Sequence, residues 1–373
     1  MNTNTVLHIL WSGSIGGAQN AVYQLVQAQI QRSKFLPVVA FAKTQGVYFG
    51  KIKALGCEIL DLNLSSDKYV HSLLRLQKVL RLYPIHHFHS AELTLTLSSI
   101  LCKKARRVYT QRGGLMDYRG KQKLRYMLIG LLLRHFFHGY SGNTKHACIS
   151  ASKLFDISPD LWHVTYNGLD FDLLTPQRSK SEAADEISLP MDGRATIGTS
   201  AHLRGWKRID LLLEACVKLP PESFRLIVLG DGPDRPRLES MTHALGISNR
   251  TIFTGVKERI GDYLPLLDIF VLPSMGLESF GNAAVEAMSQ GIPTIVFNDG
   301  GGLLEHVKDT ENGYVVSSVG ELSTRLGTLI NNRSLRSSLG TKAREYVTTH
   351  YTPQRMVVAY DSLYETALTR IQT

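Results

Sequence analysis

The stretch "DIFVLPSMGLESFGNAAVEAMSQGIPTIVFN" (268–298) contains two apolar runs separated by a turn-rich segment and a helix-forming segment. The runs at 268–274 and 292–298 predict buried strands, and the residues between them predict a helix from about Phe280 to Gln290. Gly291 is expected to end that helix in the left-handed conformation, and Pro293 prevents its continuation. A strand, a helix and a second strand in this order predict a parallel sheet with helices on its faces.

The same alternation runs through the whole chain in two series. Strands of the first series are predicted at 5–11, 35–42, 57–62, 85–89, 106–112, 146–150 and 162–168. The second series adds strands at 195–202, 224–232, 251–255 and 313–318, with helices at 208–219, 235–246 and 259–267. The predicted fold class is therefore α/β, with two Rossmann-like doubly wound domains that face each other across a cleft.

Length and composition agree with this division. A chain of 373 residues favours two domains, and an acidic, proline-marked connector follows "YNGLDFD". We expect domains at 1–172 and 173–352. No apolar run reaches the ~18 residues needed to span a bilayer, and the first residues lack the pattern of a signal peptide. Four scattered cysteines form no CxxC motif, which fits a reducing cytoplasm.

Positive charge is concentrated in the first half of the chain. Residues 1–175 contain 21 Lys and Arg against 9 Asp and Glu, whereas the remainder contains 21 against 23. An anionic partner of the first domain is expected: a membrane surface, an anionic glycolipid or nucleic acid. A merely soluble basic face is the alternative. No interleaved aromatic and basic motif is present, so nucleic acid is not predicted.

Two polar features of the first domain have alternative interpretations. The loop that includes Gly16 and Gly17 follows the first strand, but the second strand runs into Lys43 without a carboxylate, which argues against a dinucleotide site. Close approach of a bound group to the following helix is expected instead. His86, His87 and His89 end a strand with no carboxylate or cysteine nearby in sequence, so a packed or polar strand end is expected and no metal is predicted.

The second domain contains a candidate anion site. Arg204, Lys207 and Arg208 follow its first strand, where three cations can hold a diphosphate without a metal. Eight residues at the helical rise place Glu278 and Glu286 about 12 Å apart, roughly the length of a nucleotide sugar from ribose to hexose.

Free N–H groups of the helix start lie between these carboxylates, and Gly281 allows close approach. Gly255 ends a strand and lets a planar base lie against the backbone. The alternative interpretation of the stretch is an ordinary surface helix, and "DFD" (170–172) is explained by capping.

Taken together, these residues resemble the retaining family 4 glycosyltransferases of GT-B fold. The resemblance rests on "GGAQNAVYQL", "YNGLD", "WKRIDLLLEA", "VLGDGP", "FTG", "LPSMGLESFGNAAVEAM", "GIPTIV", "GG..E" and "ENGYVV". It implies that the second domain binds a nucleotide sugar, with Glu286 on the ribose, Glu278 on the sugar and Lys207 on the diphosphate. Backbone N–H groups of Phe280, Gly281 and Asn282 would contact phosphate or sugar, and Gly16 and Gly17 the donor phosphate or the acceptor.

The resemblance also implies that the helix at 353–373 crosses back onto the first domain. Two departures from the family pattern affect the expected chemistry. His202 stands where the family often has an arginine, and Arg204 or Arg208 is a candidate substitute. Thr110-Gln111-Arg112 replaces a threonine-x-histidine motif. Because arginine is not a base at neutral pH, Arg112 is expected to stabilise charge on the donor or to bind an anionic acceptor.

The expected function is a metal-independent retaining hexosyltransferase without a cofactor. Its expected acceptor is a lipid-linked, lipopolysaccharide or surface-polysaccharide glycan at the cytoplasmic face of an anionic membrane. A small soluble acceptor, such as an aminocyclitol or sugar, is the first alternative. A sugar-nucleotide epimerase is the second.

Overall fold

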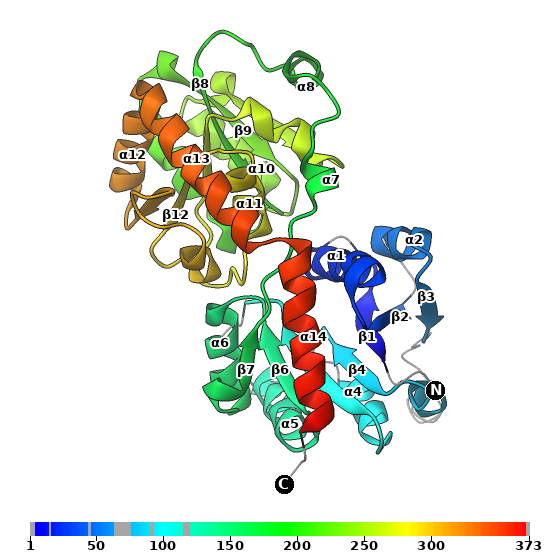
Figure 1. The fold of residues 1–373 in the computed structure, drawn as a ribbon. Helices are drawn as coiled ribbons and strands as arrows, with labels where there is room; N and C mark the ends of the chain where they lie inside the picture. Colours follow the sequence, from blue (N-terminus) through cyan, green and yellow to red (C-terminus); the bar gives the residue numbers. More distant parts are fainter. Residues whose placement is uncertain are drawn as a thin grey trace. The chain divides into compact units, whose positions relative to one another are not determined.

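A computed structural model describes residues 4–14, 16–43, 46–62, 76–89, 93–114 and 120–370 of the chain (Figure 1). The chain forms two compact units. The first consists of residues 1–168 together with 351–373, and the second of residues 169–350. The predicted class of two doubly wound α/β domains is confirmed.

The first unit is built on a parallel sheet with the strand order β3-β2-β1-β4-β5-β6-β7. Its strands are β1 (Thr5–Ser12), β2 (Leu36–Lys43), β3 (Glu58–Asp61), β4 (Ile85–Phe88), β5 (Arg106–Gln111), β6 (Gly139–Gly142) and β7 (Trp162–Val164). The order reverses direction beside β1, because β2 and β4 pair with its opposite edges. In such sheets, ligands bind beyond the carboxyl ends of the strands at this reversal.

Helices cover both faces of this sheet. One face packs on α1 (Gly17–Arg32), α2 (Val47–Ala54) and the C-terminal helix α14 (Pro353–Thr369). The other packs on α4 (Leu93–Ile100), α5 (Gly120–Phe136) and α6 (Lys145–Phe155). Successive side chains of β1 alternate between the two cores, since Val6 faces α14 and Leu7 faces the opposite core. In Figure 1, α14 is the red helix that lies along the first unit.

The second unit has a parallel sheet of order β10-β9-β8-β11-β12-β13. Its strands are β8 (Ala195–Ser200), β9 (Phe224–Leu229), β10 (Thr251–Gly255), β11 (Ile269–Leu272), β12 (Thr294–Phe297) and β13 (Gly313–Val316). Its helices are α7 (Phe171–Leu174), α8 (Lys180–Glu186), α9 (Ile209–Val217), α10 (Arg235–Ala244), α11 (Asn282–Ser289), α12 (Val319–Asn331) and α13 (Arg333–His350). Short 3-10 turns include η2 (Gly205–Lys207) and η7 (Gly301–Glu305).

The predicted strand at 146–150 is wrong. These residues lie in α6, whose first turn is capped by the Thr144 side chain accepting a hydrogen bond from the Ala147 N–H. The strand that pairs with β5 is instead β6, "GYSG". A Cβ atom on Gly142 would lie 2.8 Å from the backbone nitrogen of Cys148, so the close packing of α6 on this strand requires glycine there.

Two predicted helices also differ from the structure. Residues 259–267 form two 3-10 turns, at 260–262 and 264–266, rather than one helix, and Pro265 in the second turn lacks the N–H that a helix interior would use. The helix predicted from Phe280 begins at Asn282, because Gly281 before it has a left-handed φ of 80°. Gly291 follows the helix with φ of 75°, which confirms the predicted terminator.

No helix within the described ranges is both long and apolar enough to cross a bilayer.

The close packing of β6 yields a stability prediction. Gly142→Ala introduces a methyl group against the α6 backbone, so we expect the free energy of unfolding to fall by about 1–3 kcal/mol. Gly50→Ala is the matched control, since Gly50 lies in α2 with no heavy atom within 4 Å of the added Cβ. That change is expected to raise stability by up to about 1 kcal/mol. Urea unfolding of the first unit measures both, and equal midpoints for the two variants would contradict the packing.

Candidate functional site

The segment between β11 and α11 is folded tightly against turn η7. Gly281 adopts a left-handed conformation, and a Cβ atom there would collide with the Leu303 side chain. The Gly302 N–H donates to the Glu278 carbonyl at 2.9 Å, and Gly302 has no space for a Cβ beside Ser279. The backbone at 278–281 is therefore fixed immediately before the α11 N-terminus, where helical N–H groups favour an anion.

A buried histidine supports the same segment from behind. The Nε2 atom of His306 hydrogen-bonds the Phe280 carbonyl at 2.8 Å, and the two rings lie 4.5 Å apart. Burial lowers the pKa of His306 to about 3, so the ring is neutral and its Nε2 carries the donated proton. Sequence analysis missed His306; its place directly after "GG..E" was the available signal.

An ion pair joins the loops that follow β8 and β11. Lys207, in turn η2, places its Nζ atom on Oε2 of Glu278, and each side chain is only 12% exposed. The same Nζ lies 4.2 Å from the Trp206 ring centroid, and the Met275 N–H donates to the Trp206 carbonyl at 3.1 Å. Two of the predicted residues, Lys207 and Glu278, are thus brought together.

The other two predicted cations are placed differently. Arg208 forms a two-point ion pair with Asp299, and its Nε donates to the Pro273 carbonyl at 2.7 Å. This side chain therefore fastens the end of β11 to the loop after β12. Arg204 precedes turn η2 and is exposed. Lys207 is the cation of this set that contacts Glu278.

The second glutamate of the pair has an unusual electrostatic environment. Glu286 lies in the middle of α11 and is partly exposed, but burial of its carboxyl group raises the pKa to about 7, and the nearby Asp170 carboxylate adds to the shift. Asp170 caps α7, accepting a hydrogen bond from the Leu173 N–H, which confirms the capping interpretation of "DFD". A carboxyl group that is only partly ionised at neutral pH marks a candidate ligand contact.

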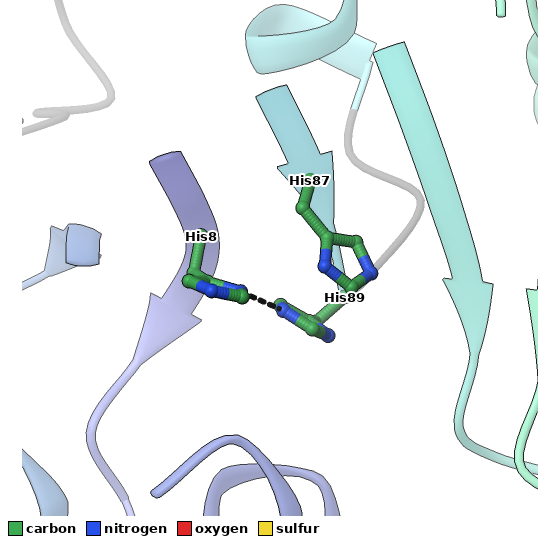
Figure 2. A group of neighbouring side chains, drawn as sticks. All are labelled: His8, His87 and His89. Carbon is green, nitrogen blue, oxygen red and sulfur yellow. Dashed lines mark hydrogen bonds between the residues drawn. The ribbon is translucent and has the colours of Figure 1, made fainter. Parts of the chain in front are cut away.

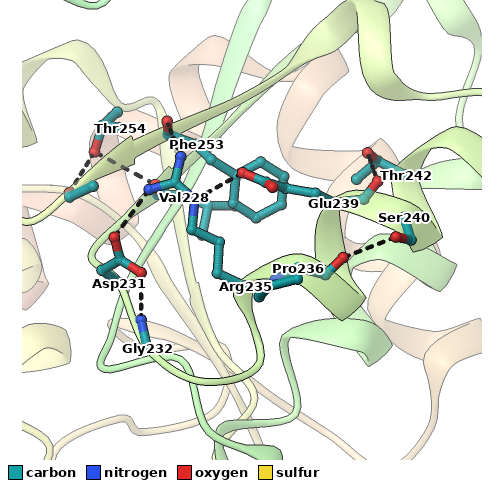
Figure 3. A network of polar contacts seen from close by, with 11 residues as sticks. Val228, Asp231, Gly232, Arg235, Pro236, Glu239, Ser240, Thr242, Phe253 and Thr254 are labelled. Atoms are coloured by element: carbon teal, nitrogen blue, oxygen red, sulfur yellow. Dashed lines mark hydrogen bonds and ion pairs between the residues drawn. The ribbon is translucent and has the colours of Figure 1, made fainter.

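Gly255 ends β10 with a left-handed φ of 71°, and its carbonyl accepts the Gly230 N–H at the end of β9. Figure 3 shows the neighbouring polar network, in which Arg235 is held by Asp231 and Glu239 at 3.0 and 2.7 Å. The Arg235 guanidinium also donates to the Phe253 carbonyl at 3.4 Å, so the network links the end of β9 to β10. Arg235 was not predicted from the sequence, because the proline that follows it is typical of an ordinary helix start.

The predicted residues of the first unit lie at the carboxyl ends of its strands. Gly16 precedes α1 in an extended conformation, and Gly17 is its first residue. Arg112 directly follows β5, is 7% exposed, and donates to His89, Asn167 and Tyr360 at 2.8–3.0 Å. The backbone near Gly16 and the Arg112 guanidinium therefore both belong to the strand-end edge where such sheets bind ligands.

Three buried histidines gather on the same face of this sheet, as Figure 2 shows: His8 on β1, His87 on β4 and His89 just beyond β4. The register pairs His8 with His87 on neighbouring strands. Nδ1 of His8 lies 2.9 Å from Nε2 of His89, and Nε2 of His8 lies 2.8 Å from Oε1 of Gln29. Burial lowers the pKa of His8 to about 3 and that of His89 well below its usual value, so both rings are neutral.

The direction of these hydrogen bonds is fixed by Arg112. Because arginine only donates, Nδ1 of His89 must accept, and the ring proton of the neutral His89 lies on Nε2. His89 then donates to Nδ1 of His8, whose own proton lies on Nε2 and is donated to Gln29. One assignment of tautomers thus satisfies the whole chain of bonds from Arg112 to Gln29.

The three histidines could be thought to hold a metal ion, because their ligand atoms lie within 4.8 Å of one another. The hydrogen bonds between Arg112 and Gln29 test whether they fit one. A metal on Nε2 of His89 would displace the proton that the Arg112 contact places there. Metal-binding imidazoles normally donate their second N–H to an acceptor, whereas the second nitrogen of His89 faces a guanidinium donor. The residues fit a hydrogen-bond chain and do not fit a metal centre.

The second unit is similar in sequence to known proteins. Residues 180–346 match the family model described as "Glycosyl transferases group 1". The chain is 28% identical over 167 residues to N-acetyl-alpha-D-glucosaminyl L-malate synthase of Bacillus anthracis, a match that covers 44% of this chain and 43% of that protein. It is 29% identical over 157 residues to the lipopolysaccharide core biosynthesis glycosyltransferase LpsE of Rhizobium meliloti, covering 41% and 45%. The chain therefore spans less than half the length of these curated relatives.

The fold extends over both units. The structure of Anabaena HepE in complex with UDP has a TM-score of 0.84 to this chain at 20% identity, covering 97% of this chain and 99% of HepE. The similarity shows that the chain has the two-domain fold of GT-B glycosyltransferases. The resemblance seen in the sequence is confirmed to this extent: the chain has the GT-B fold, and its residues 180–346 match the model of the glycosyl transferases group 1 family.

Proposed function

We propose that this chain is a retaining glycosyltransferase that transfers a hexose-type sugar from a nucleotide diphosphate sugar to a lipid-linked or surface-glycan acceptor. The observation that carries the proposal is the Lys207–Glu278 ion pair beside the α11 N-terminus, with Glu286 about one turn into that helix. A cation and helical N–H groups suit a diphosphate, and the two carboxylates suit the hydroxyl groups on either side of it.

The donor is proposed to be a UDP-sugar. Support comes from HepE, which has 20% sequence identity with this chain and whose structures contain UDP and UDP-glucose. Glu286 would accept hydrogen bonds from the ribose, Glu278 from the sugar, and Gly255 would lie against the base. Backbone N–H groups of the segment from Phe280 through Gly281 to Asn282 would contact phosphate or sugar. Gly16 and Gly17 would contact the donor phosphate or the acceptor, with Arg204 near the diphosphate.

The proposed chemistry is a front-face displacement. The bond from the anomeric carbon to the diphosphate oxygen breaks, and a bond to the acceptor hydroxyl forms on the same face of the sugar. The acceptor proton passes to the leaving phosphate, and Lys207 stabilises the charge that develops there without a metal ion. Arg112 binds an anionic group of the acceptor.

The acceptor is proposed to lie at an anionic membrane surface. Helix α5 packs Ile129, Gly130 and Leu133 into the core, yet four apolar side chains of its opposite side are exposed: Leu124 (69%), Met127 (59%), Leu128 (42%) and Leu131 (42%). Their spacing makes one continuous stripe. Exposed Lys121 and Lys123 in the first turn supply positive charge, so the stripe combines the two features of an interfacial helix.

A small soluble acceptor is the second candidate. It is favoured by the Bacillus anthracis relative, whose name specifies L-malate. Transfer assays with lipid-linked and soluble acceptors separate the candidates. Changes in the exposed apolar stripe of α5 should slow transfer to a lipid-linked acceptor and leave transfer to a soluble acceptor unchanged. An epimerase on this fold would release no glycosylated product.

The donor proposal predicts slow hydrolysis of one nucleotide sugar from a panel, with EDTA leaving the rate unchanged. Lys207→Ala is expected to lower this rate at least tenfold, because it removes the cation beside the leaving phosphate. Lys218→Ala, at an exposed lysine directly after α9, is the control and should match the wild type. Release of nucleotide diphosphate, measured with a coupled assay, reports the rates. The proposal fails if no nucleotide sugar is bound or hydrolysed.

The raised pKa of Glu286 predicts pH-dependent stability. Because its pKa rises from 4.5 unfolded to about 7 folded, the folded state is penalised as pH increases through this interval. Glu286→Gln should therefore stabilise the second unit at pH 8.5, by about 1–3 kcal/mol, and have little effect at pH 5. Urea unfolding followed by Trp206 fluorescence measures this. Glu214→Gln, at an exposed position of α9, is the control, and a pH-independent effect of Glu286→Gln would refute the environment described.

The membrane proposal predicts cosedimentation with vesicles that contain anionic lipid at low salt. The double change Leu124→Glu and Leu128→Glu should weaken binding at least fivefold, since it places charge in the apolar stripe. Leu82→Glu is the matched control, because Leu82 is also exposed in the first unit (54%) but lies outside α5. Wild-type protein that remains in solution, or equal losses in both variants, would exclude docking through α5.

A further inference from the structure

The beginning of the chain has an unusual charge composition. Residues 1–57 contain no Asp or Glu, and Glu58 on β3 is the first acid along the sequence. The described part of this stretch forms β1, α1, β2 and α2, which are among the blue elements of Figure 1. The stretch contains five basic residues: Arg32, Lys34, Lys43, Lys51 and Lys53. These cations can be neutralised only by carboxylates that come from other elements.

Lys34 and Lys43 differ in this respect. Lys34 forms an ion pair with Glu365 of α14. Lys43 forms no ion pair within the described residues, and its Nζ atom instead lies 5.5 Å from the centroid of the Trp11 ring. A ring face attracts an ammonium through its quadrupole and carries no net charge. The Lys43 ammonium is therefore oriented by an aromatic ring and keeps its full positive charge.

Trp11 and Lys43 stand at the carboxyl ends of neighbouring strands. The register pairs Ser12 at the end of β1 with Lys43 at the end of β2. Trp11 is 41% exposed although it lies within β1, whereas the strand residues that precede it from Val6 onward are buried. Doubly wound sheets bind ligands beyond this edge, beside the strand where the order reverses, which is β1 here. The indole and the ammonium are thus exposed at the edge where a ligand is expected.

The loops beyond these two strand ends hold each other in place. The Tyr48 N–H donates to the Gly13 carbonyl at 3.0 Å. Gly46 has a φ of 108°, and a Cβ atom there would lie 2.3 Å from the same carbonyl oxygen. The hydroxyl groups of Ser12 and Ser14 lie 2.9 Å apart on the exposed side of this loop. The backbone that presents Trp11 is therefore fixed from both strands, with two hydroxyl groups beside it.

An exposed indole beside an ammonium suits a sugar that carries a negative charge. The electron-rich face of an indole attracts the C–H groups on one side of a pyranose ring, as it attracts an ammonium. An ammonium has three donors, so contact with a ring leaves donors for phosphate or carboxylate oxygens. Serine hydroxyls both donate and accept, which matches the hydroxyl groups of a sugar.

We propose that Trp11 and Lys43 form an acceptor subsite that binds a pyranose ring bearing a phosphate or carboxylate group. The indole stacks on the ring, the ammonium binds the anionic group, and the hydroxyls of Ser12 and Ser14 contact those of the sugar. The proposal rests on the proposed function, in which the acceptor is a glycan. A lipid headgroup phosphate has the same charge but lacks the ring, so it would use Lys43 without Trp11.

The experiment uses the full chain labelled with 5-fluorotryptophan, because the sequence contains only three tryptophans, Trp11, Trp162 and Trp206. The fluorine signal of Trp11 is assigned by its loss in Trp11→Phe. Glucose 6-phosphate is the probe, and we expect it to shift the Trp11 signal but not that of Trp162, which is 7% exposed. Glucose lacks the charge of the probe, and glycerol 3-phosphate lacks its ring. Each should bind at least fivefold more weakly.

Two lysine substitutions test the role of the ammonium. Lys43→Gln should raise the Kd for glucose 6-phosphate at least fivefold, since it removes the cation beside the indole. Lys53→Gln is the matched control, because Lys53 is an exposed lysine of α2 in the same acid-free stretch. It removes the same charge from the first unit and should bind the probe like the wild type. Both side chains are exposed, so neither change disturbs the core.

The proposal is overturned if the Trp11 signal does not respond to glucose 6-phosphate, or if Lys43→Gln and Lys53→Gln bind it alike. Equal binding of glycerol 3-phosphate would also overturn it, and would identify a site for phosphate alone, as in a lipid headgroup. The Trp206 ring lies beside Lys207, so its signal reports UDP binding in the same spectra. A Trp206 signal that ignores UDP counts against the proposed donor site, whereas the Trp11 signal alone decides the sugar subsite.

Discussion

The ion pair between Lys207 and Glu278 is the interaction on which the candidate donor site depends. It joins the loop after β8 to the loop after β11, two neighbouring strands of the same parallel sheet. Both side chains are largely removed from water, so the loss of either partner would leave a poorly solvated charge. Around this pair, Gly302 allows a close approach to the Ser279 backbone that any Cβ would prevent, Gly281 has a left-handed φ, and Arg208 anchors the adjacent loop through Asp299.

The polar contacts beyond the strand ends differ between the two units. In the second unit, the ion pairs Lys207–Glu278 and Arg208–Asp299 lie beyond the carboxyl ends of the strands. In the first unit Arg112 donates hydrogen bonds to His89 beyond β4, Asn167 beyond β7 and Tyr360 on α14. Helix α14 is the last element of the chain, so a side chain at position 112 is fixed by residue 360, which is far away in sequence.

The sequence predicted the fold class because apolar strands such as β9 and amphipathic helices such as α9 carry strong periodic signals. It failed at β6, since the strand "GYSG" has no strand-forming pattern and exists because α6 packs closely on Gly142. For the candidate site, local motifs predicted the residues around Glu278 and Glu286. The pairing of His8 with His89 depends on strand order and register, which no local pattern contains.

The ion-pair partner of Arg208 also could not be predicted from a local sequence pattern. The expected diphosphate contact of Arg208 stays a prediction, and no local pattern indicated that its side chain pairs with Asp299, which is 91 residues away. Charge patterns along a sequence can predict which loop is cationic, but partner choice depends on the tertiary fold. The predicted donor roles of Lys207, Glu278 and Glu286 remain proposals, supported by the geometry of one loop pair and one helix.

The central claim is that the segment from Glu278 to Glu286 forms the donor site. Hydrogen exchange of backbone amides, with and without saturating UDP-glucose, tests it most directly, because amides that contact a bound phosphate exchange more slowly. We expect protection in the peptides that contain residues 279–286 and 204–208. Protection confined to other parts of the chain, with these two segments unchanged, would contradict it.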